Sequence, residues 1–139
     1  MLSINDIKQI NVVYTQQESD TINSVVSIIN AIRSFTNCTT NEIVKDTFQY
    51  RDVAPRLAVN ILIKLSVNLE YEDIDKLLKS IFCINAEQRF KFMLEAGLEP
   101  RRVVAIAKKE LGIVTVLRNL QSVRNFETPG DFLEALADW

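Results

Sequence analysis

Glycine and proline are scarce in this sequence, which has three of each in 139 residues. An all-β chain needs a turn roughly every ten residues, and turns draw heavily on these two residue types. Apolar residues instead recur at helical spacing between capping signals. The sequence therefore predicts an all-α fold, a single compact irregular bundle of about eight or nine short helices. With 47% apolar and 24% charged residues, residues 1–139 are expected to form one helical domain.

Helix-start and helix-stop signals divide the chain into segments. One of them, residues 57–65, is apolar on most of its helical faces, which predicts a place at the centre of the fold. The expected helices begin near Ser3, at Ser19 (running to about Phe35), at the Thr39–Glu42 capping box, at Pro55, at the acidic cluster 70–75, at the Asn85–Gln88 capping box (running to Gly97), at Pro100 (running to Gly112), at Ile113, and at Thr128 with Pro129 and Asp131.

Histidine is absent from the sequence. A chain without it, acting alone, has no Ser-His or Cys-His nucleophile pair, no His-containing zinc site and no imidazole general base. The three glycines also lie too far apart for a dinucleotide-binding or Walker phosphate loop. We therefore expect a protein that is not an enzyme, with no catalytic residues and no cofactor.

Two cysteines and one acidic cluster are the remaining candidates for site chemistry. Cys38 and Cys83 match no zinc or CxxC spacing, and because free cysteine is among the most buried residue types, both are expected in the core. The acidic cluster 70–75 lacks the glycine and the distal glutamate of an EF-hand, and its charges suit the first turn of a helix. No metal site is predicted.

Membrane and export signals were sought along the chain. It contains no run of about eighteen apolar residues, and its first residues, MLSINDIKQI, lack a basic region followed by an apolar core. The sequence therefore predicts neither a membrane span nor a signal peptide, and we expect a cytoplasmic protein.

Positive charge is concentrated in one part of the chain. Residues 89–124 carry eight basic and three acidic side chains, a net of +5, although the formal net charge of the whole chain is −2. Gly97 separates two expected helices, as in a helix-turn-helix unit, and the second of them would turn several cations outward. The basic 97–124 segment is therefore a candidate for binding DNA or RNA, through Arg101, Arg102, Lys108, Lys109 and Arg118.

Two features weaken this helix-turn-helix hypothesis. Met93 is bulky at a place where close crossing of the two helices favours alanine, and Val104 is expected to point toward the supposed DNA face. Helix pairs broken by a glycine also occur in α-proteins of many functions. Nucleic-acid binding is therefore the alternative to a first hypothesis of another class.

The first hypothesis is a non-enzymatic interaction protein, an adaptor, inhibitor or assembly component that contacts another protein or associates with itself. Phe132, Leu136 and Trp139 recur at i, i+4 and i+7, which makes them candidate partner-binding residues. Phe132, Leu133 and Leu136 are expected to face inward on the last helix. That helix has three possible roles: completing the core, covering the basic segment, or entering a partner's groove.

Overall fold

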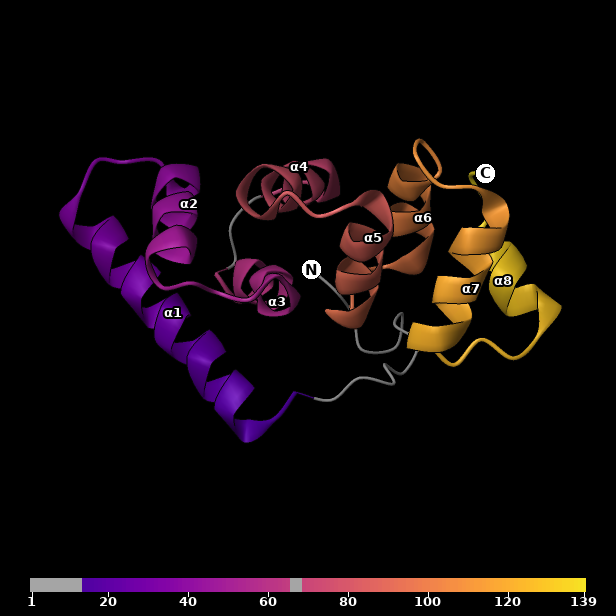
Figure 1. Cartoon of the computed structure of the whole chain (residues 1–139), viewed down its shortest axis with the longest axis horizontal. Helices are drawn as coiled ribbons and strands as arrows, with labels where there is room; N and C mark the ends of the chain where they lie inside the picture. The colour runs from indigo at the N-terminus through magenta and orange to yellow at the C-terminus, as the bar shows by residue number, and fades with distance from the viewer. Residues whose placement is uncertain (1–13, 66–68) are drawn as a thin grey trace. The chain divides into compact units, whose positions relative to one another are not determined.

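The computed structural model describes residues 14–65 and 69–139. These residues hold eight α-helices and no strand, which confirms the predicted all-α fold class. They divide into two compact units, Tyr14–Cys83 and Ile84–Trp139 (Figure 1). The helix expected near Ser3 lies outside the described residues, and a single domain over 1–139 stays a prediction.

The first unit consists of α1 (Gln16–Phe35), α2 (Thr40–Tyr50), α3 (Pro55–Lys64) and α4 (Tyr71–Phe82). α3 packs against α1 and α4, and α2 packs against the same two helices. Half of α3 is buried, so the apolar segment 57–65 forms the core of its unit, as predicted. Its buried residues are Leu57, Ala58, Val59, Ile61, Leu62 and, after the helix ends, Leu65.

The N-terminal caps of the helices follow the sequence signals with one exception. The predicted capping boxes are observed at α2 (Thr39–Glu42), α5 (Asn85–Gln88) and α8 (Thr128–Asp131). The prediction that Ser19 caps α1 is wrong, because the cap is Thr15, whose hydroxyl accepts the Glu18 amide at 3.1 Å. Thr15 and Glu18 make a complete capping box, whereas the residue three positions after Ser19 is Ile22, which cannot bond back to the cap.

Both cysteines are exposed, which overturns the expectation of buried thiols. Cys38 lies in the loop between α1 and α2, and Cys83 ends α4 with a left-handed backbone conformation, φ 54°. Cysteine is buried where a helix or strand turns it toward a core, and neither position does so. The acidic cluster, by contrast, lies as predicted, with Glu72 and Asp73 in the first turn of α4.

The second unit holds α5 (Ala86–Glu95), α6 (Pro100–Ala107), α7 (Ile113–Val123) and α8 (Pro129–Ala135). α6 packs against the other three helices, and α5 also packs against α7. Gly97 follows α5, which ends before it as expected, and its φ of 94° is a left-handed conformation that glycine adopts readily. The expected end of α6 at Gly112 is wrong: the helix ends at Ala107, and Gly112 is instead the N-cap of α7.

A guanidinium group lies in the interior of this second unit. The side chain of Arg124 is fully buried and donates hydrogen bonds to the Leu94 carbonyl at 2.7 and 3.1 Å and to the Leu98 carbonyl at 2.8 Å. Carbonyls at the end of a helix have no partner within the helix. Arg124 therefore ties the last turn of α5 and the following loop to the end of α7.

Candidate functional site

The cations of α6 and of the turn after it reach solvent. Arg101, Arg102, Lys108 and Lys109 are all exposed, and we call this set the basic face of α6. Val104 is only 1% exposed, so the expectation that it points outward is wrong. Because three helices pack against α6, only a narrow arc of it reaches solvent. The buried residues of α6 are Pro100, Val103, Val104, Ile106 and Ala107.

The segment after α8 contacts part of this basic face. The guanidinium of Arg101 donates two hydrogen bonds to the Asp138 carboxylate, from Nε and Nη2, both at 2.9 Å. Lys108 Nζ donates to the main-chain carbonyl of Asp138 at 2.6 Å. The hydrogen bond from Arg101 holds the pKa of Asp138 below its ordinary value, and the same contact raises the pKa of Arg101. The last helix therefore packs on α6, and Asp138 covers part of its charge.

Two other cations of the basic segment lie elsewhere. Arg118 projects from α7, where it forms an exposed ion pair with Glu87 at 3.7 Å. Arg124 is buried and bonded to main-chain carbonyls, so it offers no charge to a partner. The net charge of +5 counted over residues 89–124 thus overstates the charge available at the surface.

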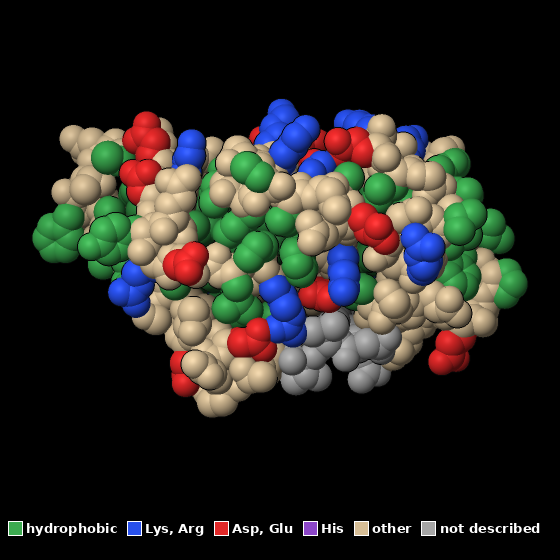
Figure 2. Space-filling view, viewed as in Figure 1, with side chains coloured by type: hydrophobic (Ala, Val, Ile, Leu, Met, Phe, Trp, Pro, Cys, Tyr) green, Lys and Arg blue, Asp and Glu red, His purple; other side chains and the backbone are tan. Residues whose placement is uncertain are grey.

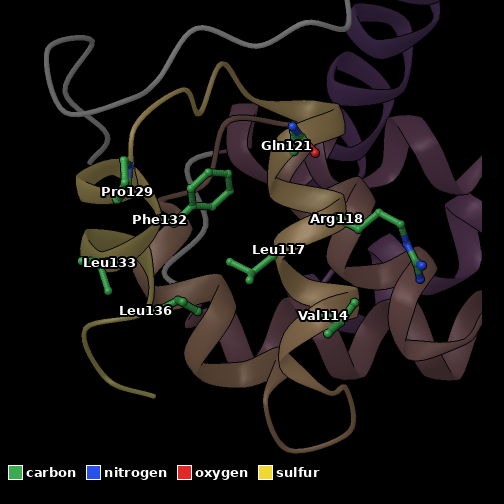
Figure 3. A pocket seen from close by; sticks show the side chains of 8 residues that line it. All are labelled: Val114, Leu117, Arg118, Gln121, Pro129, Phe132, Leu133 and Leu136. Carbon is green, nitrogen blue, oxygen red and sulfur yellow. The ribbon is translucent and has the colours of Figure 1, made fainter.

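A groove runs between α7 and α8, with a volume of about 540 Å³ (Figure 3). One wall is formed by Val114, Leu117 and the side chain of Arg118 on α7. The other wall is a single side of α8, because its residues follow at helical spacing. It consists of Phe132, Leu133 and Leu136, with Pro129 at the start of the helix. Figure 3 shows Leu117 extending from α7 toward α8.

The walls of the groove are apolar and reach solvent. Val114 is 70% exposed and Leu133 is 67% exposed, so the expectation that Leu133 faces inward is wrong. In α8 the buried residue is Ala135, whereas Leu133, two positions earlier, is exposed. In the view of Figure 2, apolar side chains gather over α7 and α8. This part of the second unit is an open apolar surface.

Phe132 and Leu136, two of the predicted partner-binding residues, lie together in this groove. The ring of Phe132 stacks on the buried Phe126 with centroids 5.4 Å apart, which holds it against the unit's core. Trp139, the third predicted residue, is 47% exposed and does not line the groove. Phe132, Leu136 and Trp139 were expected to be anchors that enter a partner, whereas Phe132 and Leu136 form part of a groove wall in the structure.

The wall on α7 was not predicted, although the sequence holds a signal for it. The helical stripe of this segment is Val116, Leu117, Leu120 and Val123, and three of these four are buried. Ile113 and Val114 are large apolar residues outside that stripe, and both are exposed. Apolar residues on the outward side of a helix with a complete core stripe indicate a second contact surface.

Neither the metal-ligating side chains, nor the hydropathy of the described helices, nor similarity to known proteins assigns a further site to this chain. Within residues 14–65 and 69–139, no group of three or more metal-ligating side chains occurs. None of the described helices is long and apolar enough to cross a membrane. Comparisons with protein-family models, with curated proteins and with solved structures found no match for this chain.

Proposed function

We propose that this chain is a non-enzymatic helical interaction protein that receives an amphipathic helix of another protein in the groove between α7 and α8. The supporting observation is the contiguous apolar lining of that groove, with Val114 and Leu133 largely open to solvent. Single exposed apolar residues are common on protein surfaces, but several that line one groove mark an interaction site.

The chemistry of the lining favours a helix over a small polar ligand. A small-molecule site places several polar groups to fix the orientation of its ligand. Here Arg118 and Gln121 are the polar residues of the lining, and both lie on α7. An apolar floor between two helices is the surface that takes the i, i+3/i+4 and i+7 side chains of a third helix.

The charge at the groove specifies the polar side of the partner. Figure 3 shows the guanidinium of Arg118 at the edge of the groove away from α8. Its present partner, Glu87, also accepts a hydrogen bond from the Asn119 amide at 3.0 Å, so Glu87 keeps a donor when Arg118 moves. An exposed ion pair of this kind contributes little stability. The partner helix is therefore expected to carry a carboxylate beside its apolar stripe, facing Arg118.

The proposal is tested with two synthetic helical peptides of about 16 residues, roughly 24 Å of helix. Both carry the same leucine stripe, and one has glutamates beside the stripe where the other has lysines. Titration of the isotopically labelled protein, followed by amide chemical shifts, is expected to show tighter binding of the glutamate peptide, with the largest shifts in α7 and α8. The variant Arg118→Glu is expected to reverse the preference between the two peptides.

Matched surface variants distinguish docking in the groove from nonspecific hydrophobic binding. Leu133→Asp is expected to weaken binding about tenfold or more, which corresponds to about 1.4 kcal/mol or more. Tyr50→Asp, at an even more exposed apolar position on α2, is expected to leave it unchanged. Equal affinities of these two variants, or no binding of either peptide, would contradict the proposal. A wild-type dimer that Leu133→Asp dissociates would assign the groove to a second copy of the chain instead.

Nucleic-acid binding through the basic face is the second candidate function. The exposure of all four of its cations supports it. However, α6 has only eight residues and is packed against three helices, so it does not present the free recognition helix that enters a major groove. Helix-turn-helix recognition therefore has less support than the apolar groove.

A further inference from the structure

The basic face of α6 holds more charge than Asp138 neutralises. Arg101 and Arg102 lie in the first turn of α6, Lys108 and Lys109 lie in the turn that follows its last residue, and all four are exposed. Asp138 bonds to Arg101 and Lys108. Lys109, which follows Lys108 directly, is exposed as well, and Arg102 is exposed next to Arg101.

The contact made by Asp138 shows which chemistry this face recognises. A planar guanidinium bonds a carboxylate through two parallel hydrogen bonds, and Arg101 does so here. Lys108 bonds the main-chain carbonyl of the same residue. The face thus recognises a carboxylate and a peptide carbonyl together, which are the groups that an acidic stretch of polypeptide repeats.

Another anion can also replace Asp138 in its contact with Arg101. The side chains of Arg101 and Asp138 are 50% and 51% exposed, so water or another anion can reach both. Asp138 benefits from belonging to the same chain, which gives it a high effective concentration at the face. An incoming segment overcomes this advantage when several of its carboxylates engage the four cations at once.

From these features we propose that the basic face of α6 is a second binding site, for an acidic segment of another protein, and that Asp138 occupies part of this site until the segment displaces it. The site is distinct from the groove, and the observations that support it do not rest on the proposed function. The contact itself favours an acidic peptide over a nucleic acid, because Asp138 presents a side-chain carboxylate to Arg101 and a main-chain carbonyl to Lys108.

The test compares the wild-type protein with Asp138→Asn, using a fluorescein-labelled peptide of ten aspartates as the probe. Asp138 is half exposed, so the substitution leaves the fold in place. We expect Asp138→Asn to bind the probe about fivefold or more tightly than wild type, with an affinity that falls as salt is raised. In wild type, the probe is expected to shift the fluorescence of Trp139, the only tryptophan in the sequence, because it displaces the adjacent Asp138.

A second substitution, added to Asp138→Asn, shows where the probe binds. In the Asp138→Asn background, Arg102→Ala and Lys109→Ala are each expected to weaken binding about threefold or more, whereas Lys45→Ala, an exposed lysine on α2, leaves it unchanged. Equal affinities of wild type and Asp138→Asn would overturn the inference. So would equal effects of Lys45→Ala and Lys109→Ala, or tighter binding of a single-stranded thymidine oligonucleotide than of the aspartate peptide, which would identify a nucleic-acid surface.

Discussion

Arg124 provides the sharpest test of how the second unit is held together. Its buried guanidinium makes three hydrogen bonds to the carbonyls of Leu94 and Leu98. Arg124→Ala removes the donor of the Leu98 carbonyl, and a buried polar group that loses its partner costs about 1–3 kcal/mol, whereas the Leu94 carbonyl keeps the Gly97 amide at 3.1 Å. Because the lost packing of the side chain adds to this, we expect a decrease of about 3–5 kcal/mol in the free energy of unfolding. Typical domains have only about 5–15 kcal/mol in total.

Urea unfolding followed by the fluorescence of Trp139 measures this loss, because the tryptophan belongs to the same unit. The matched control is Arg118→Ala on the same helix, whose side chain is 65% exposed and whose removal is expected to cost under about 0.5 kcal/mol. Arg124→Lys keeps the positive charge but lacks the planar fork, so its stability should lie between those of wild type and Arg124→Ala. A loss below about 1 kcal/mol for Arg124→Ala would refute the assigned role of the guanidinium.

Further predictions concern the core, the Asp138 contact and the thiols. Leu62→Ala, at a position 2% exposed in α3, should lower the free energy of unfolding by about 2–5 kcal/mol in calorimetry or urea titration, and a loss under about 0.5 kcal/mol would place α3 at the surface. The lowered pKa of Asp138 means that its contact with Arg101 is present above the ordinary aspartate range and is lost as the pH falls through the lowered pKa. An acid titration of Trp139 fluorescence should therefore show a transition below that range, and its persistence in Asp138→Asn would contradict the assignment. Cys38 and Cys83 are both exposed and should react with a thiol reagent in the folded protein within the time course of a free thiol, whereas delayed reaction limited by unfolding would show that they are protected.

The parts of the fold that the sequence predicted are those decided by local interactions. A capping box is complete within four residues, so the boxes at Thr39 and Asn85 are readable without knowledge of the rest of the chain. The same holds for Gly97, where the left-handed conformation favours glycine. The start of α1 was missed although its signal, Thr15 followed by Glu18, is of the same local kind.

The predictions that were wrong concern side chains whose burial depends on how many other helices pack against their own helix. Val104 was expected outside because a two-helix unit leaves that side of α6 open, but α6 packs against three helices and buries it. Leu133 was expected inside together with Phe132 and Leu136, but it is 67% exposed, and Ala135 is the buried residue of α8. A helical period gives the angle between side chains, and the packing of other helices determines which angles are covered.

The two candidate sites also differ in whether the local sequence could predict them. The four cations of the basic face belong to one short stretch, so the sequence alone predicted that they reach solvent. The groove combines Leu117 of α7 with Leu136 of α8, and nothing local in either helix indicates that the two lie across a common space. Asp138 could not be matched to Arg101 for the same reason, since 37 positions separate them in the sequence.

The two proposed sites share one structural element, since α8 is a wall of the groove and is followed directly by Asp138. Its side with Leu133 and Leu136 lines the groove, and Ala135 is buried where α8 packs on α6. With seven residues, α8 has little helical stability of its own and depends on that packing. Displacing Asp138 from Arg101 removes one of the contacts that hold the end of α8 on α6. An acidic segment bound at the basic face therefore acts on the wall that a partner helix contacts, and by linkage a helix in the groove must change the affinity of the basic face by the same factor.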